Sequence, residues 1–202
     1  MRPCAVKDGK GALAGDLLLD VDRLHRVVED LLLLARTDAD AALPLRRQRV
    51  DVTGLVCEVV RRYAGARVPV TCHAPADLTW ATEPDALSRI LINLLDNAVR
   101  HADSVVRVDV AADPTGDGDV VLAVTDDGPG IPAADRAQVF ERFARMDNDR
   151  GRASGGSGLG LPIVAALAER LGGRIELTDA PNRAGLRAEL RIPADRSGTQ
   201  LT

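Results

Sequence analysis

Aromatic residues are nearly absent from this sequence: one Trp, one Tyr and two Phe make up 2% of its 202 residues. A core must therefore be built from Leu, Val, Ile and Ala, which is ordinary for a helical or mixed α/β domain with a hydrophobic fraction of 46%. The three cysteines contain no C-x-x-C pair, so neither a zinc site nor a disulfide framework is predicted. We expect reduced thiols, as in cytosolic proteins.

Long apolar runs and runs of basic residues are also missing. The longest apolar stretches, LLLLA at 31–35 and ILINLL at 90–95, are far shorter than the roughly 20 residues of a membrane-spanning helix. The N-terminal segment MRPCAVKDGKG lacks the apolar centre of a secretory signal. The net charge of −4 gives no support for binding to nucleic acid or to an anionic membrane. We therefore expect a cytoplasmic chain without a membrane segment or a nucleic-acid partner.

The first part of the chain is predicted to be a disordered tail followed by one long helix. Residues 1–15 are rich in glycine and charge, whereas apolar residues recur at heptad spacing within residues 16–37. One helix cannot bury its own seam, so a partner helix is implied. A linker containing Pro44 is expected at 38–48, and a short tail at 196–202. The seam consists of Leu17, Val21, Leu24, Val28, Leu31 and Ala35.

Residues 49–195 alternate between helical and extended patterns, which predicts one mixed α/β domain. Helices are expected at 54–63 with Thr53 as cap, from Pro84 to 101, at about 133–141, and from near Pro162 to Gly172. Strands are expected at 68–73, 78–81, 105–112, 120–126, 174–178 and 186–192, with 105–112 and 120–126 forming a hairpin.

The predicted helix that begins at Pro84 carries two asparagines on one stripe. Asn93 and Asn97 are four residues apart, and the opposite face of the helix is apolar. Asparagine is a mediocre helix former, because its amide competes for backbone hydrogen bonds. The helix alone leaves two interpretations open, a solvated polar face or a pair of amides that serve a ligand.

Two glycine-rich segments follow that helix. In TDDGPGIP, at 125–132, Asp126 stands at the end of a strand, and the glycines let the backbone approach a ligand closely. A buried carboxylate accepts hydrogen bonds only, which suits an exocyclic amine such as that of adenine, although an ordinary turn also explains the segment. In GGSGLGLPIV, at 155–164, alternate glycines precede a helix whose free N–H groups can face a phosphate.

The second segment differs from two familiar phosphate-binding loops. The dinucleotide fingerprint requires G-x-G-x-x-G directly after a strand, whereas here polar residues precede G-x-G-x-G. The Walker motif requires G-K-[ST], which this segment lacks. A flexible linker is disfavoured, because the apolar residues Leu159, Leu161, Ile163 and Val164 are regularly spaced.

Four blocks therefore follow one another: an asparagine-bearing helix, D-x-G-x-G after a strand, the segment VFERF at 139–143, and G-x-G-x-G before a helix. This order resembles the ATP-binding domain of sensor histidine kinases, in the superfamily that also contains type II topoisomerase, chaperone and mismatch-repair ATPases. The resemblance covers residues 45–195. It implies an α+β fold of two layers, with a mixed sheet packed on helices (the Bergerat-type ATP-binding fold), preceded by a long helix of a helical hairpin. It also implies ATP and Mg²⁺ as cofactors.

The resemblance assigns roles to individual residues. Asn97 matches the Mg²⁺ ligand, and Asp126 matches the carboxylate that binds the adenine amine. Asn93 replaces the glutamate that activates water in hydrolysing members, and an amide cannot accept a proton, so ATP should be held for a kinase reaction. Together with Asn93, Arg100 and Arg145 form the expected catalytic set, because they can neutralise phosphates. The expected nucleotide-binding residues are Asn93, Asn97, Arg100, His101, Asp126, Gly128, Gly130, Ile131, Phe143, Gly156, Ser157, Gly158, Leu159, Gly160 and Leu161.

A phosphoacceptor histidine of the family's usual kind is not found in this sequence. His25 lies on the seam helix, but Arg26 follows it in place of an acid and no proline comes after, so we expect a helix-surface residue. The helix resembles the second arm of the family's dimerisation hairpin. The resemblance thus implies transfer of the ATP γ-phosphoryl group to a histidine on a hairpin, in the same full-length protein or in trans.

The implied partners are that hairpin, a response regulator and a second copy of the chain in a full-length homodimer, and full-length relatives are often membrane-anchored. Two alternatives stay open. One is a serine kinase of the anti-sigma-factor type, and the other is a nucleotide-binding or dimerisation module without catalysis.

Overall fold

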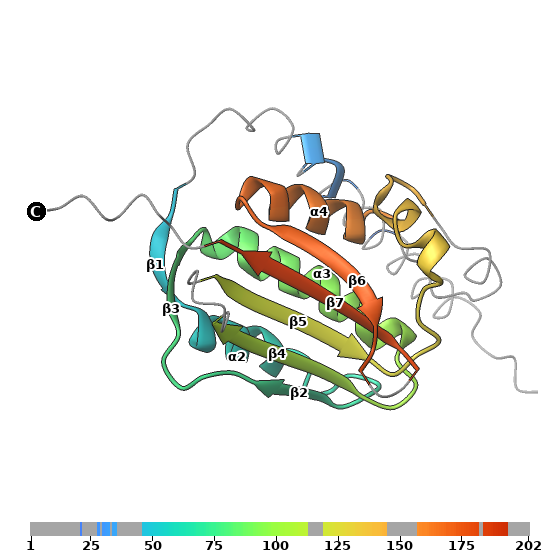
Figure 1. Ribbon diagram of the computed structural model, residues 1–202, viewed down its shortest axis with the longest axis horizontal. Helices are drawn as coiled ribbons and strands as arrows, with labels where there is room; N and C mark the ends of the chain where they lie inside the picture. Colours follow the sequence, from blue (N-terminus) through green and yellow to red (C-terminus); the bar gives the residue numbers. More distant parts are fainter. Residues whose placement is uncertain are drawn as a thin grey trace, which may run out of the picture.

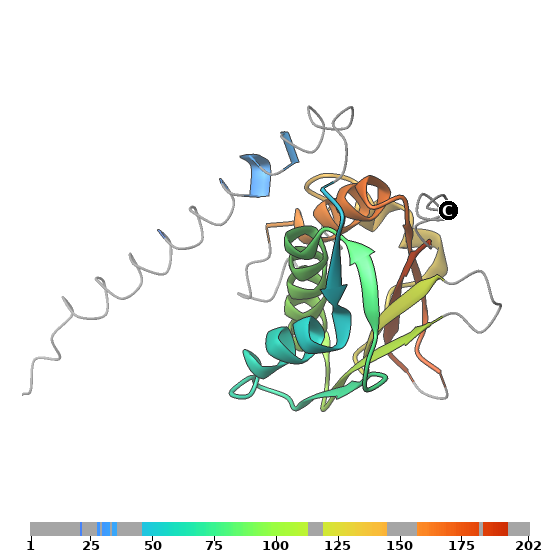
Figure 2. The same ribbon diagram turned by 90° about the vertical axis from the view of Figure 1, so that its left-hand side faces the viewer.

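A mixed five-stranded sheet with helices on one face forms the body of the protein (Figures 1 and 2). The computed structural model describes residues 21, 28, 30–32, 34–35, 46–112, 119–144, 157–181 and 184–193. The strand order is β2-β4-β5-β7-β6, and only the β2–β4 pair is parallel. The expected two-layer α+β fold is confirmed. The strands are β2 (Val70–His73), β4 (Val106–Ala112), β5 (Val120–Asp126), β7 (Leu186–Ile192) and β6 (Arg174–Asp179).

Alternation of side chains decides which face of the sheet meets the helices. In β4, Val106, Val108 and Val110 are buried, whereas Arg107 and Asp109 between them point to the other face. The predicted hairpin of β4 and β5 is confirmed, with Val106 paired to Asp126 at the end of the ladder. This register places the Asp126 carboxylate on the helix side of the sheet, at the end of a central strand.

Three helices cover the inner face: α2 (Val52–Arg61), α3 (Pro84–His101) and α4 (Gly160–Arg170). The helix α3 has the predicted bounds, because Pro84 opens its first turn and its Leu and Ile residues form one buried stripe. Its side chains Ile90, Leu91 and Leu95 are fully buried. The long helix therefore packs on the sheet with α2 and α4 beside it (Figure 1), which fixes the position of its polar stripe.

Several predicted element boundaries are wrong. The helix α2 begins at Val52, because the Asp51 carboxylate caps it by accepting the Gly54 N–H at 2.9 Å. The expected cap, Thr53, instead donates its hydroxyl to the Pro75 carbonyl at 2.8 Å. The helix expected near Pro162 already begins at residue 160. Proline is tolerated in the first turn, because a backbone N–H at that position would have no acceptor within the helix.

The helix expected at 133–141 is replaced by two short 3₁₀ turns, η2 (Ala133–Asp135) and η3 (Gln138–Phe140). Only Val139 and Phe140 pack against the core from this segment, so it has no apolar face long enough to stabilise an α-helix. A small antiparallel sheet of β1 (Gln48–Asp51) and β3 (Thr79–Thr82) is also present, and β1 was not predicted.

The described residues of the N-terminal segment, 21, 28, 30–32 and 34–35, are helical. They lie on the α3–α4 side of the domain, in blue in Figure 2. Leu34 joins the core and Asp30 is buried, whereas the seam residues Val21 and Val28 are exposed. The expected tails at 1–15 and 196–202 lie outside the described residues, as does most of the expected linker. In the part of the chain that the structure describes, we find no helix with the length and apolar character needed to cross a membrane.

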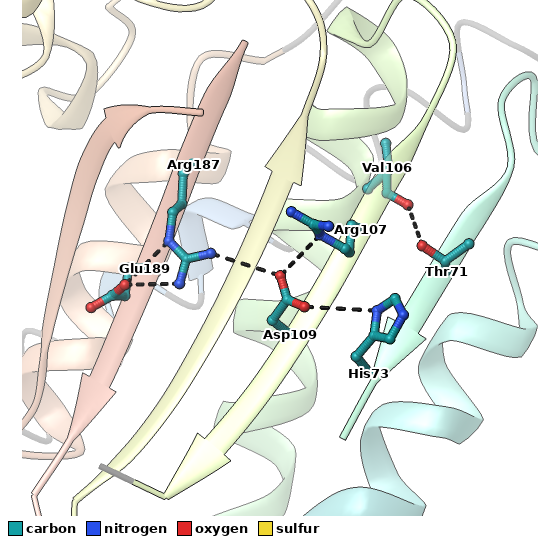
Figure 3. Close-up of polar contacts among 7 residues, drawn as sticks. All are labelled: Thr71, His73, Val106, Arg107, Asp109, Arg187 and Glu189. Carbon is teal, nitrogen blue, oxygen red and sulfur yellow. Dashed lines mark hydrogen bonds and ion pairs between the residues drawn. The ribbon is translucent and has the colours of Figure 1, made fainter. Parts of the chain in front are cut away.

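Charged side chains cover the outer face of the sheet (Figure 3). Arg187 on β7 reaches across β5 to Asp109 on β4, at 3.7 Å, and Asp109 also pairs with Arg107 at 3.2 Å. His73 on β2 approaches the same carboxylate at 3.7 Å. The central strand contributes the small residue Ala123 beneath these side chains, and it is fully buried. The charges on this face thus form ion pairs with one another, and the polar groups of the predicted site lie on the opposite side.

Candidate nucleotide-binding site

Four polar side chains follow one another along α3 at intervals of four residues: Arg89, Asn93, Asn97 and His101. This spacing places them on one gently winding stripe, with a rise of about 6 Å from each to the next. Different parts of the fold meet the stripe at its two ends. The strand β5 stops at the His101 end of the stripe.

Asp126 lies at the His101 end of the stripe. The residue is only 5% exposed, and its carboxylate accepts the Gly128 N–H at 2.9 Å. Burial raises the pKa of the Asp126 carboxyl, although hydrogen bonds from the Gly128 and Leu186 backbones and the nearby His101 oppose this shift. A Cβ added to Gly128 would lie 2.2 Å from the His101 carbonyl oxygen, so only glycine fits between α3 and the carboxylate. These contacts produce a fixed, desolvated hydrogen-bond acceptor.

A second turn packs against the backbone of Asp126. Gly130 has a φ of 72°, and a Cβ on it would lie 3.0 Å from the Gly185 carbonyl oxygen. Gly185 itself has a φ of 132° and lies so close to Asp126 that an added Cβ would come within 2.0 Å of the Asp126 carbonyl oxygen. Sequence reasoning did not select Gly185. Its only signal was a glycine immediately before a predicted strand, which is typical of many turns.

Asp127 is a further residue that the sequence did not reveal. Its carboxylate accepts the backbone N–H groups of Asp103, Ser104 and Val105 at 3.0, 2.9 and 3.1 Å, and the Ser104 hydroxyl also donates to it. Slight burial acts to raise the pKa of Asp127, but the hydrogen bonds from Ser104, Val105 and Asp103 outweigh it and lower the pKa. Asp127 thereby joins the end of α3 to the end of β5, directly beside Asp126.

The middle of the stripe meets the N-terminus of α4. A Cβ added to Gly160, the first residue of α4, would lie 3.3 Å from Asn93 Oδ1. The Asn93 amide nitrogen donates to the Arg89 carbonyl at 2.9 Å. Free N–H groups at a helix N-terminus attract anions, so phosphate groups bound here would lie beside Asn93.

The second glycine segment is joined to the segment that contains the two phenylalanines. The Phe143 N–H donates to the Gly158 carbonyl at 3.2 Å, and both residues have positive φ values, 65° and 71°. A Cβ on Gly158 would lie 3.1 Å from the Ala144 carbonyl oxygen. The Ser157 hydroxyl accepts the Leu159 N–H at 3.3 Å. The structure thus brings both glycine segments to α3, the first at His101 and the second at Asn93, and joins the second to the phenylalanine segment.

The remaining predicted residues lie in different settings. Leu159 is fully buried in the core, so only its backbone can face a ligand, whereas Phe143 is 60% exposed. Ile131 and Leu161 are half-buried against the core. Arg100 is exposed in the last turn of α3. Arg145 and Gly156 lie outside the described residues.

A comparison with known families decides what this arrangement is. The model of the histidine kinase-, DNA gyrase B-, and HSP90-like ATPases matches residues 82–196, which include α3, the turn at Asp126 and the start of α4. The chain belongs to this ATPase family. The resemblance predicted from the order of the sequence blocks is therefore confirmed.

Relatives of known description place the chain among sensor histidine kinases of this ATPase family. It is 39% identical over 185 residues to a "Probable sensor histidine kinase HK" of Mycobacterium tuberculosis, which covers 92% of this chain and 47% of that protein. It is 42% identical over 143 residues to the "Sensor histidine kinase component HK1" of the same species, covering 71% of this chain and 80% of the relative. The chain therefore spans less than half the length of the first of these relatives.

A solved structure has the same architecture over most of the length of this chain. Full-length ShkA, crystallised in complex with AMPPNP, superposes with a TM-score of 0.77 at 26% sequence identity. The alignment covers 94% of this chain and 40% of that chain. The predicted fold of the ATP-binding domain is confirmed by this likeness.

Proposed function

We propose that the chain binds Mg·ATP and transfers its γ-phosphoryl group to a histidine on a dimerisation hairpin, as the catalytic domain of a two-component sensor histidine kinase. The observation that carries this proposal is the buried Asp126 carboxylate, held by Gly128 beside His101. A desolvated carboxylate that only accepts hydrogen bonds selects an amine donor, and the exocyclic amine of adenine supplies one. The domain spans residues 49–195 in this proposal, and the helix within 16–37 belongs to the hairpin.

The position of the base fixes the direction of the nucleotide along α3. With adenine at Asp126 and His101, the phosphates extend toward Gly160 and Asn93, about 12 Å along the helix axis for the eight residues from His101 to Asn93. The N-terminus of α4 then faces the phosphates, and Gly158 and Ser157 lie in the loop before it. Arg100 and Arg145 complete the set by neutralising phosphate charge.

Asn97 lies between the two ends of the stripe, where Mg²⁺ is expected. Its amide oxygen is a hard ligand, and the residue is partly exposed. No cluster of three or more His, Cys, Asp or Glu side chains that could hold a metal occurs among the described residues. One amide ligand together with phosphate oxygens and water fits Mg²⁺, which takes few protein ligands. When bound, Mg²⁺ would neutralise the negative charge of the phosphates.

Asn93 favours transfer to a protein over hydrolysis. Its amide donates to the Arg89 carbonyl and offers no basic group to a water molecule beside the phosphates. A nucleophile from another protein segment is therefore needed. We propose that a histidine-bearing hairpin provides it, in the same full-length protein or in trans, and that a response regulator later receives the phosphoryl group.

The exposed seam of the N-terminal helix supports the proposal that the full-length protein is a homodimer. Val21, Val28 and Leu31 are exposed, whereas Asp30 and Leu34 on the other side are buried against the domain. Apolar seam residues at heptad spacing gain stability when a partner helix covers them. The helix is thus free to join a hairpin bundle while its opposite side stays on the ATP-binding domain.

The proposal is tested by phosphoryl transfer from γ-labelled ATP to a separately supplied hairpin that carries a histidine, with and without Mg²⁺. The expected result is Mg²⁺-dependent label on the hairpin that is lost in acid, because phosphohistidine is acid-labile. Asn97→Ala should lose the label, whereas Gly65→Ala, outside the site, should keep it. Acid-stable label on serine would instead indicate the anti-sigma-factor type of kinase, and ATP binding without any label would indicate a module without catalysis.

A further inference from the structure

The stripe on α3 continues one turn beyond Asn93, to Arg89, and this residue has no role in the proposed function. The Arg89 guanidinium donates to Asp30 Oδ1 at 2.5 Å, which joins α3 to the N-terminal helix. Asp30 is 7% exposed, so the pair is partly shielded from water. The contact therefore places a carboxylate of the N-terminal helix beside the polar stripe of the nucleotide site.

The guanidinium is not fully satisfied by this contact. Among the residues that the structure describes, the buried Arg89 Nε has no hydrogen-bond acceptor. A guanidinium offers five N–H donors in a rigid fork that matches phosphate as well as carboxylate geometry. A phosphate can therefore replace the Asp30 carboxylate as the hydrogen-bond acceptor of Arg89, because it fits the guanidinium equally well.

The position of Arg89 relative to the nucleotide follows from the order of residues along α3. Asp126 and Gly128 meet the stripe at His101, and Gly160 meets it at Asn93. The phosphate chain therefore points from His101 toward Asn93, and Arg89 lies about 6 Å further along the axis, beyond the terminal phosphate. An extended arginine side chain can span this distance.

We propose that Arg89 is a binding residue for the terminal phosphate of ATP and that Asp30 masks it when the N-terminal helix lies in the observed position. This inference rests on the proposed function of the same site. Movement of the helix would withdraw the Asp30 carboxylate and leave Arg89 free to meet the γ-phosphate. The position of the N-terminal helix then sets the preference of the site for ATP over ADP.

The test measures the affinities of the protein for ATP and for ADP, both with Mg²⁺, by titration calorimetry. Asp30→Asn should raise the affinity for ATP about three- to tenfold and leave that for ADP unchanged, as expected for one added charged hydrogen bond at a partly exposed site. Arg89→Gln should abolish the gain, so that the double variant behaves like Arg89→Gln alone. Glu83→Gln is the matched control, because the Glu83 carboxylate accepts a hydrogen bond from another half-buried arginine, Arg170 of α4, at 3.1 Å. It should not alter the ratio of the two affinities.

A charge exchange separates phosphate binding from mere stabilisation. Asp30→Arg combined with Arg89→Asp can restore the ion pair and the unfolding temperature, but it places a carboxylate near the phosphate and should lower the ATP preference below that of the wild type. If Asp30→Asn leaves the ATP-to-ADP ratio unchanged, or if the exchange restores both stability and ATP preference, the masking role is wrong. Failure of the wild type to bind ATP at all would contradict the proposed function itself.

Discussion

Replacement of Asp126 by asparagine separates adenine recognition from the stability of the fold. The Asp126 Oδ1 accepts the Gly128 N–H, so an asparagine whose oxygen takes that position would turn its NH₂ group toward the ligand. A donor would then face the adenine amine, itself a donor. Loss of a hydrogen bond to a charged group costs about 1.5–3 kcal/mol, which corresponds to about a 10- to 150-fold weaker affinity for ATP.

The assay compares ATP with purine riboside triphosphate, which lacks the exocyclic amine, by titration calorimetry. The wild type should bind the analogue more weakly than ATP by a similar factor, whereas Asp126→Asn should lose this preference for ATP. Equal affinities of the wild type for both ligands, or unchanged ATP binding by the variant, would refute the assignment of Asp126 to the base.

The same substitution should stabilise the protein at neutral pH. Burial raises the pKa of Asp126 in the folded state, so folding becomes less favourable as the pH rises through and above the ordinary aspartate pKa of about 3.9. Asparagine carries no charge and avoids this penalty. The variant should therefore unfold at a higher temperature than the wild type at pH 7, and the difference should shrink as the pH falls toward 4 and below.

Three further predictions concern other parts of the site. Asn93→Glu should introduce a general base and raise Mg²⁺-dependent phosphate release about tenfold or more in a hydrolysis assay, whereas Asn93→Gln should not. Gly128→Ala should lower the unfolding temperature by about 3–10 °C, because the added Cβ would collide with the His101 carbonyl and overpacking costs about 1–3 kcal/mol. The control Gly65→Ala should leave the unfolding temperature unchanged, because a Cβ there would have no neighbour within 4 Å. Asp127→Ala should cost about 1 kcal/mol of stability at neutral pH, as for a lost cap. Because the folded pKa of Asp127 is lowered, this loss should shrink as the pH falls through that pKa in a denaturation series.

Residues whose local chemistry is distinctive could be assigned from the sequence. Pro84 and the apolar period of α3 predicted its bounds, and alternation predicted β4, with β5 as its hairpin partner. The placement of Asp126 at a strand end followed directly from these elements. The local sequence pattern is sufficient to predict an element when the same residues determine both its backbone conformation and its buried face.

Features that depend on contacts between distant segments could not be predicted in this way. Asp127 acts through backbone N–H groups more than twenty residues earlier, and Gly185 is required only because the Asp126 backbone passes next to it. The 3₁₀ turns near Phe140 replaced a predicted helix because too little apolar surface was available there. The contact of Asp30 with Arg89 likewise joins two helices whose spacing in the sequence gives no signal.

The most direct test of the account maps the ligand on the folded chain by NMR. Isotope-labelled protein is titrated with Mg²⁺ and a non-hydrolysable ATP analogue, and backbone and side-chain amide shifts are followed. The account predicts the largest shifts at Gly128, at Gly160 and at the side-chain amide of Asn97, with no change at His73 on the outer face of the sheet. Shifts concentrated on that outer face, or unchanged signals for Gly128 and Asn97 at saturation, would contradict it.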